Sequence, residues 1–196
     1  MDRYHSDNNR SNIHQPLIIS LYSSAYRKMK RYVISVGGSI INPEPGKVDI
    51  VFLEKLREII NSFDARFVIV VGGGKTARSY QECAKAFHVS SDDLDWIGIM
   101  VTRVNAEIVR SVFSAKKKVI YDPSLELSFG NEKTLIAAGW KPGWSTDYDA
   151  VLLARNVGAK TVINMTNVDY LHDKDPRKYK TAKKIENISW KGFRKI

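Results

Sequence analysis

The stretch "FVIVVGGGKTAR", residues 67–78, decides the fold class of this 196-residue chain. Its first five residues form a short apolar run rich in β-branched side chains, which predicts a buried strand. Three glycines follow, and the apolar spacing after them predicts a helix over about residues 75–87. A strand that passes through a glycine turn into a helix is the repeating unit of α/β folds.

The same alternation of elements continues on both sides of this stretch. Short apolar runs predict further strands at residues 31–36, 117–121, 134–138 and 161–165. Helical spacing of apolar residues predicts helices over residues 49–62, about 96–113 and about 147–157. We therefore expect a mainly parallel sheet covered by helices on both faces, with ligands beyond the carboxyl ends of the strands.

Composition limits the class of protein. Hydrophobic residues make up 43% of the chain and charged residues 27%, as in a soluble globular domain. The net charge of +10 indicates either anionic partners or a solvated basic surface. The single cysteine, Cys83, excludes a disulfide framework and fits a reducing, cytoplasmic location. No apolar run approaches the ~20 residues of a membrane span, so we expect no membrane partner.

Residues 1–28 differ from the rest of the chain. They are polar and aperiodic, which predicts a disordered N-terminal arm. We expect one folded domain over residues 29–196.

Two of the predicted strands end in glycine loops. The loop "VGGSI", residues 36–40, places Gly37, Gly38 and Ser39 where backbone amides can approach a phosphate. The loop "GGGKTAR" adds the cations Lys75 and Arg78 at a helix N-terminus, which suits an anion. A purely structural turn is the alternative in both places, and neither loop has the Walker A or dinucleotide spacing.

A third loop, "GWKPGWSTDYDA" at residues 139–150, has an unusual inventory for a simple connection. Ser145 or Thr146 can cap the helix that we expect to begin near Asp147. Asp147 then lies in the first turn, where it can hold cations or backbone amides in place. Asp149 is expected to be a solvated first-turn acid.

The same loop carries one lysine and two tryptophans. Lys141 can neutralise phosphate charge. Trp140 and Trp144 can stack on a base, although core packing is the commoner role of tryptophan. A fourth loop, residues 166–178, contains the hydrogen-bonding residues Asn167 and Asp169 and a turn at Asp175.

Six segments, taken in order, carry a resemblance to a known family: "VISVGGSI", "IVVGGGKTARSY", "DWIGIMVTRVNAEIV", "KPGWSTDYDAVLLA", "INMTNVD" and "DPRKYKTAKKI". Over about residues 30–190 they resemble the amino-acid-kinase superfamily, and within it the archaeal type of uridylate (UMP) kinase. The resemblance implies a three-layer α/β/α sandwich. It also implies transfer of the γ-phosphoryl group of ATP to UMP with Mg²⁺, and assembly into hexamers.

The resemblance also implies roles for individual residues. The transferring phosphoryl group is assigned to the first glycine loop and to an organising aspartate: Gly37, Gly38, Ser39 and Asp147. UMP is assigned to Gly73, Gly74, Arg78, Asp95 and Thr146. The ATP side is assigned to Gly37, Gly38, Thr166, Asn167, Asp169 and Asp175. Phosphoryl transfer fits these residue types, because it needs positioning and charge neutralisation more than covalent chemistry from the protein.

The chain departs from the family pattern in three places. Ser35 stands where many superfamily members have a lysine, and residues 170–171 replace the usual Gly-Val. The chain ends at Ile196, before the helix and strand with which the family normally closes, so a C-terminally shortened form of the fold is expected.

Other functions fit parts of the same pattern. A kinase of this fold with another small acceptor is one alternative, although "GGGKTAR" favours a phosphorylated acceptor. A non-catalytic nucleotide-binding or storage relative is another. We expect no specific nucleic-acid partner, because the sequence contains no recognisable nucleic-acid-binding motif.

Overall fold

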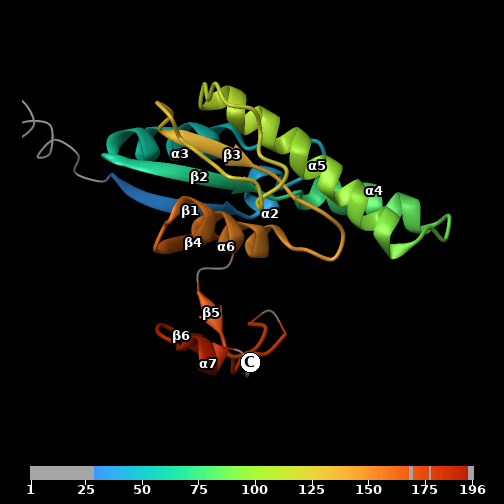
Figure 1. Ribbon diagram of the computed structural model, residues 1–196. Helices are drawn as coiled ribbons and strands as arrows, with labels where there is room; N and C mark the ends of the chain where they lie inside the picture. The colour runs from blue at the N-terminus through green and yellow to red at the C-terminus, as the bar shows by residue number, and fades with distance from the viewer. Residues whose placement is uncertain (1–28, 168–169, 177, 194–196) are drawn as a thin grey trace, which may run out of the picture.

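The computed structural model describes residues 29–167, 170–176 and 178–193. The predicted arm at residues 1–28 lies outside the described residues. Figure 1 shows a twisted sheet with helices on both sides. Its strands are β1 (Lys30–Val36), β2 (Ala65–Val71), β3 (Thr134–Ala137) and β4 (Thr161–Met165), in the order β3-β2-β1-β4. All neighbouring pairs are parallel, as expected from the alternation of elements.

The helices that surround this sheet are α2 (Gly38–Ile41), α3 (Ile50–Ser62), α4 (Gly74–Lys85), α5 (Ser91–Val112) and α6 (Thr146–Val157). A smaller segment follows, with β5 (Leu171–His172) antiparallel to β6 (Lys184–Ile185) and a short helix α7 (Trp190–Phe193). In Figure 1 this segment lies apart from the four-stranded sheet.

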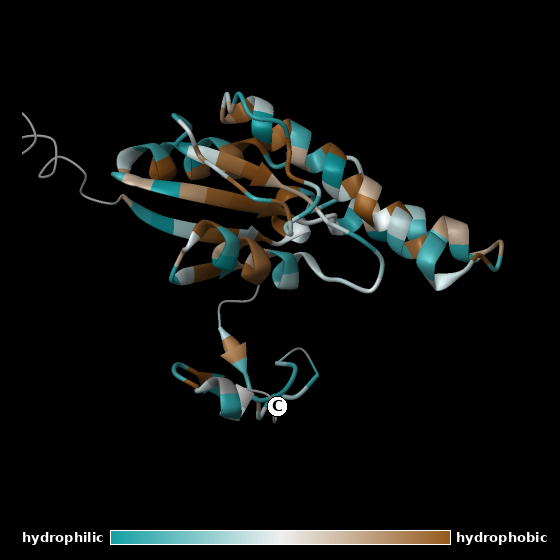
Figure 2. Cartoon of the chain, viewed as in Figure 1, coloured by the Kyte–Doolittle hydropathy of each residue, from teal (hydrophilic) through white to brown (hydrophobic). Residues whose placement is uncertain are grey.

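The sheet has a separate apolar core on each face. On one face, alternate residues of β1 and β2 such as Ile34 and Ile69 pack with α3 and α5. On the other face, Val33 and Val68 pack with α6, including Leu153. Figure 2 shows the strands as the hydrophobic layer between helices of mixed character. The predicted three-layer α/β/α sandwich is therefore confirmed.

Register brings the carboxyl ends of the strands to one edge. Ile34 pairs with Ile163 on one side and with Ile69 on the other, and Ile69 pairs with Ile136. Because this isoleucine row crosses all four strands, the loops that leave β1, β2, β3 and β4 begin side by side.

The strand predicted at residues 117–121 is wrong. Only Ile120 forms a bridge, to Ala137, and its N–H donates to the Ile136 carbonyl at 2.9 Å. The three lysines at residues 116–118 are exposed to solvent, and a proline follows at residue 123. Charged side chains and a missing backbone donor oppose a longer strand in this place.

Helix α5 begins several residues before its predicted start at residue 96. The Ser90 side chain caps it by accepting a hydrogen bond from the Asp93 N–H at 3.1 Å. This first turn is polar, so apolar periodicity did not reveal it. Among the described residues, no helix is long and apolar enough to span a membrane.

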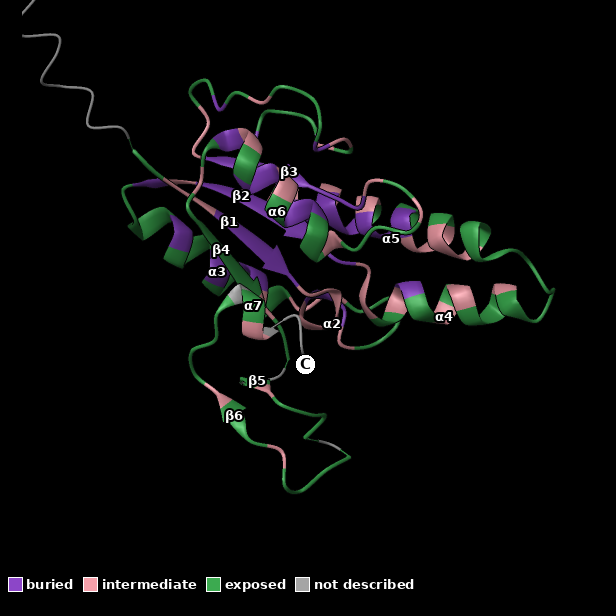
Figure 3. Cartoon of the chain, turned by 60° about the horizontal axis from the view of Figure 1, so that its bottom comes forward, coloured by how far each residue is buried: buried purple, intermediate pink, exposed green. Residues whose placement is uncertain are grey.

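Strand β4 is an edge of the four-stranded sheet and remains largely exposed, in contrast to the buried strands β1, β2 and β3 (Figure 3).

Candidate functional site

The two glycine loops pack backbone against backbone. Gly72 donates its N–H to the Val36 carbonyl at 3.0 Å, which joins the end of β2 to the end of β1. A Cβ atom added to Gly38 would overlap the backbone of Gly73 and Gly74. Gly74 also has a φ of +68°, which disfavours other residues. Glycine is thus required where the two loops meet.

Asn105 supports the second glycine loop from α5, a role that was not predicted from the sequence. Its buried side-chain amide donates to the carbonyls of Gly72 and Gly73, at 2.9 and 3.3 Å. A polar residue among the apolar positions of a predicted helix was the signal available in the sequence.

Helix α4 presents the positive end of its dipole at the edge of the second glycine loop. Gly73 provides no side-chain cap, and the first turn contains no acidic residue. Arg78 lies one turn further on, exposed, and no ion pair or hydrogen bond to another described residue engages its guanidinium. The Lys75 N–H donates to the Asn42 carbonyl at 3.3 Å, but the positive end of the helix and the exposed Arg78 guanidinium still favour an anion.

A pocket of about 460 Å³ lies between α4, α5 and the loop that joins β3 to α6. All of the residues that the sequence assigned to UMP line it: Gly73, Gly74, Arg78, Asp95 and Thr146. Lys141 and Trp144 line it as well. The structure therefore brings together, in one cavity, residues that come from three separate segments of the chain.

The loop from Gly139 to Ser145 is fixed at its far end. The Asp95 carboxylate, on α5, accepts a hydrogen bond from the Gly143 N–H at 2.8 Å. Ser145 caps α6 by accepting from the Tyr148 N–H at 3.2 Å, so Ser145 and not Thr146 is the cap. Thr146 is left to face the pocket.

Lys141 lies against the two tryptophans of this loop. Its Nζ atom is 4.0 Å from the centroid of the Trp140 ring and 4.9 Å from that of Trp144. The Trp144 ring also meets Tyr148 edge to face, at 4.6 Å between centroids. Cation–π contacts of this kind favour an ammonium group over the face of an aromatic ring.

Asp147 lies at the carboxyl edge of the sheet, next to β1. The hydroxyl of Ser35 donates to Oδ1 of Asp147 at 2.6 Å, and Ser35 itself is only 1% exposed. Ser35 is the second-to-last residue of β1, so Asp147 is held close to the start of the Gly37–Gly38 turn. Asp147 is exposed and does not line the 460 Å³ pocket.

Asp149 is not the solvated acid that the sequence predicted. It is fully buried, and its Oδ2 atom accepts a hydrogen bond from the Trp140 N–H at 3.2 Å. Burial raises the pKa of Asp149 to about 6, and the hydrogen bond from Trp140 opposes this shift only in part. The prediction failed because Asp149 lies on the helix face that packs on the sheet, four residues before Leu153.

The residues predicted for ATP are only partly brought together. Gly37 donates its N–H to the Met165 carbonyl at 2.8 Å, so Thr166 and Asn167 begin beside the first glycine loop. Asp175 lies in the smaller segment that contains β5 and β6, away from these loops (Figure 1). Asp169 lies outside the described residues.

Acidic residues, histidine and cysteine form no group of three that could hold a metal ion within the described parts of the chain. Mg²⁺ fits this arrangement when it arrives on nucleotide phosphates, since it usually keeps water and phosphate oxygens among its ligands.

Comparison with known proteins agrees with this geometry. Residues 30–195 match the amino acid kinase family. A uridylate kinase of Pyrococcus abyssi is 38% identical over 168 residues, which cover 81% of this chain and 72% of the relative. A uridylate kinase of Methanocaldococcus jannaschii is 38% identical over 170 residues, or 82% and 74% of the two chains.

Solved structures give the same result. The crystal structure of uridylate kinase from Archaeoglobus fulgidus superposes with a TM-score of 0.70 at 31% identity, over 84% of this chain and 77% of the other. UMP kinase from Ureaplasma parvum shares the fold, with a TM-score of 0.67 at 21% identity over 84% and 78% of the two chains. From its sequence match, its relatives and its three-layer fold, the chain belongs to the amino acid kinase family.

Proposed function

We propose that this protein is a uridylate kinase, which transfers the γ-phosphoryl group of ATP to UMP and releases UDP and ADP. The observation that carries the proposal is the pocket in which Arg78, Lys141 and the N-terminus of α4 converge. These groups supply positive charge and hydrogen-bond donors for the phosphate of UMP. The similarity to archaeal uridylate kinases supports uridine as the nucleoside.

Asp95, Thr146 and Trp144 form the rest of the pocket wall. We assign Asp95 to the ribose, because a carboxylate accepts hydrogen bonds from hydroxyl groups. Thr146 is assigned to the uridine side of the acceptor. Trp144 offers an aromatic surface of the kind on which a base can stack.

The reaction centre is assigned to the carboxyl edge of β1, beside this pocket. The turn at residues 37–39 packs on Gly74, so a phosphate held by α4 lies close to the backbone amides of that turn. Asp147, held by Ser35, is assigned to the same edge, where it orients the groups that neutralise the moving phosphoryl. Such positioning and charge stabilisation account for most of the catalysis in phosphoryl transfer.

The donor side is assigned to Thr166 and Asn167 after β4, with Asp169 and Asp175 as the further residues that the family resemblance implies. ATP is proposed to bring Mg²⁺ with it, which neutralises phosphate charge when bound. We further propose that the protein acts in the cytoplasm as a homo-oligomer.

The decisive experiment compares UMP with uridine. If α4 and Arg78 hold the acceptor phosphate, UMP should bind more tightly than uridine in calorimetry, and Arg78→Ala should remove most of the difference. A charge-assisted, bidentate contact contributes about 1.5–3 kcal/mol, or roughly ten- to a hundred-fold in affinity.

Lys85→Ala is the matched control, because it removes one positive charge from the far end of the same helix. This variant should bind UMP like the wild type. Equal affinities for UMP and uridine would refute the assignment of the pocket. UMP binding without UDP formation in the presence of ATP and Mg²⁺ would indicate a non-catalytic relative.

A further inference from the structure

Asp149 is a buried carboxylate for which the proposed reaction has no direct use. It is 0% exposed and points from α6 toward the sheet layer. Its Oδ2 atom has one hydrogen bond, from the Trp140 N–H, and its Oδ1 atom is buried without a partner among the described residues. An apolar side chain would pack here at lower cost, because a buried carboxylate with one hydrogen bond loses most of its solvation.

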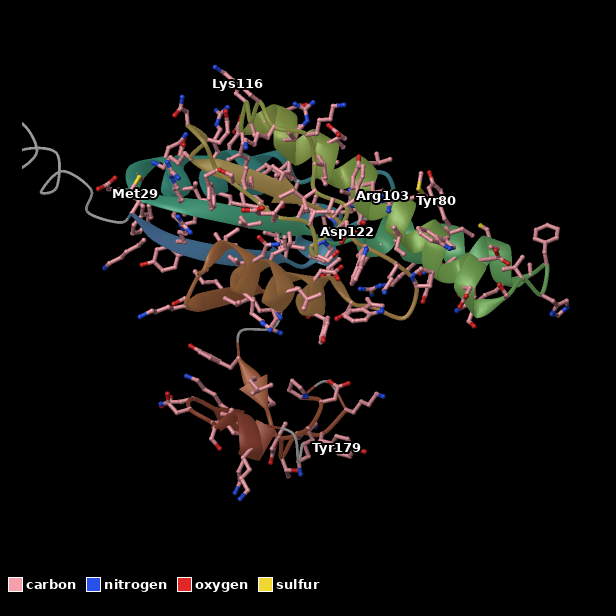
Figure 4. The ribbon with its side chains drawn as sticks, viewed as in Figure 1. Met29, Tyr80, Arg103, Lys116, Asp122 and Tyr179 are labelled. Carbon is pink, nitrogen blue, oxygen red and sulfur yellow. The ribbon has the colours of Figure 1, made fainter. Side chains whose placement is uncertain are left out.

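The contact that Asp149 makes is part of a clamp on the backbone of Trp140. On the α6 side, Asp149 accepts from the N–H of Trp140 at 3.2 Å. On the α5 side, Arg103 donates from Nη2 to the Trp140 carbonyl at 3.3 Å, and Figure 4 labels Arg103 on this helix. One residue earlier, the Gly139 N–H donates to Oγ1 of Thr102 at 2.9 Å. Side chains from both helical layers thus fix the chain where it leaves β3.

The clamp determines where the functional groups of the loop lie. The Trp140 ring is the closest aromatic surface to the Lys141 ammonium, at 4.0 Å, and it also meets Trp144 at 5.1 Å between centroids. Lys141 and Trp144 both line the pocket. A change in the orientation of Trp140 would therefore move a positive charge and an aromatic ring at the pocket wall.

We propose that Asp149 is a positioning residue for the acceptor pocket: by holding the Trp140 peptide, it keeps Lys141 and Trp144 in place for the acceptor nucleotide. The identity of that acceptor, UMP, rests on the proposed function. Asp149 acts through the loop and touches no reacting group. Its loss should therefore weaken acceptor binding and leave the use of ATP unchanged.

The first test distinguishes two properties of the Asp149 carboxylate: that it accepts the hydrogen bond from Trp140, and that it carries a negative charge. Asp149→Ala removes the acceptor, whereas Asp149→Asn keeps a carbonyl oxygen for the Trp140 N–H. Asp149→Ala should raise KM for UMP at least about ten-fold and leave KM for ATP within about two-fold. Asp149→Asn should stay within about three-fold of the wild type for both substrates.

Leu153→Ala is the matched control for lost stability. Leu153 is a buried residue of the same helix, one turn further on, and it packs in the apolar core with Val33 and Val68 and does not line the pocket. It should lower Tm without changing KM for UMP. If Leu153→Ala raised KM for UMP as much as Asp149→Ala does, the inference would be overturned, because any loss of packing in α6 would then have the same effect.

A double-mutant cycle tests the route through Lys141. Lys141→Met should raise KM for UMP, and adding Asp149→Ala to it should raise KM by less than about three-fold more, because both changes affect the same charge. Fully additive effects would show that Asp149 does not act through Lys141 and would overturn the inference.

A measurement without nucleotide separates this inference from the proposed function. Acrylamide should quench the tryptophan fluorescence of Asp149→Ala more strongly than that of the wild type, Asp149→Asn or Leu153→Ala. Should the wild type make no UDP, the proposed function fails while the quenching result still tests the clamp. Quenching equal to that of Leu153→Ala overturns the clamp, even with kinase activity present. If Asp149→Ala does not fold, Arg103→Met releases the carbonyl of the same residue, Trp140, and should give the same quenching and KM changes.

Discussion

Asp147 and Asp149 stand two positions apart in the chain, but their carboxylates lie in different surroundings. Asp147 is exposed and accepts the Ser35 hydroxyl at 2.6 Å, whereas Asp149 is fully buried against the sheet. Helical geometry explains the contrast, because residues two apart point about 200° away from each other around the axis. The two acids therefore support two different predictions.

Asp147→Asn should keep the fold and most of the affinity for UMP, because the side chain keeps its shape and still offers an oxygen to Ser35. The negative charge that orients the reacting groups is lost. We expect UDP formation from ATP, UMP and Mg²⁺ to slow by at least about ten-fold, or about 1.4 kcal/mol of barrier. An unchanged rate would show that the reaction centre lies elsewhere.

Asp149 should make the free energy of unfolding depend on pH. Burial raises its pKa from 3.8 to about 6 in the folded protein, so the folded state binds more protons than the unfolded state between these values. The stability that protonation provides is thus present below about pH 4 and is lost as the pH rises to about 6.

Urea unfolding of the wild type and of Asp149→Asn, from pH 4 to pH 7, isolates this effect from the other carboxylates. The amide in the variant carries no titrating charge, so the variant should gain roughly 1–3 kcal/mol relative to the wild type across this window. If the difference in the free energy of unfolding between the two proteins did not change with pH, Asp149 would have the same pKa in the folded and the unfolded state.

For single residues, the sequence predicted which side chains line the pocket but not which side chains hold the pocket loops in place. Arg78 was recognised because it follows a glycine loop at a helix N-terminus, whereas Asp95 and Thr146 were assigned through the family resemblance. Asn105 and Asp149 were missed or misjudged, because their roles depend on which helix face meets the sheet. From a single sequence it is difficult to predict which face of the first turn of a helix will be buried.

The two glycine loops and the helix α4 form the element on which the pocket depends. Gly74 has a φ of +68°, and a Cβ atom there would also collide with the backbone of Gly38. Gly46 has a similar φ of +71°, but an added Cβ would meet nothing within 4 Å. The two glycines share the left-handed conformation but not the collision, so Gly46 is a control for the cost of the conformation.

Gly46→Ala should therefore lower the free energy of unfolding by about 1–2 kcal/mol, which is the cost of the left-handed conformation. Gly74→Ala should lower it by more, and should also weaken UMP binding, because the loops must separate. Urea unfolding and calorimetry measure both effects. Equal losses of stability in the two variants would show that close packing of the loops contributes nothing.

Most elements were predictable from hydrophobic periodicity. The four strands of the sheet and the helices α3, α4 and α6 lie within a few residues of their predicted positions. The segment at residues 117–121 has the apolar pattern of a strand, but solvation of its lysines limits it to a single bridge. The small segment with β5 and β6 has few apolar residues, and no periodicity marked it in advance.

On the scale of the whole molecule, the outer face of α5 carries apolar side chains that the described chain does not cover. Val104 is 61% exposed and Met100 is 55% exposed, and they lie four residues apart on one face of the helix. Both line a groove with Ile108 and Tyr121. The family resemblance predicts a homo-oligomer, and exposed apolar side chains grouped in this way, with Arg103 and Glu107 beside them, are typical of a contact between subunits.

Met100→Glu combined with Val104→Glu should therefore reduce the molar mass in solution, because two charges in an apolar contact cost more than the contact provides. Light scattering coupled to size-exclusion chromatography measures this mass directly. Val51→Glu combined with Ile59→Glu is the matched control, since both residues are similarly exposed on α3, and it should leave the mass unchanged. A wild type that is monomeric at micromolar concentration would contradict the prediction. So would an oligomer that dissociates only with the α3 substitutions, which would place the contact on the other helix.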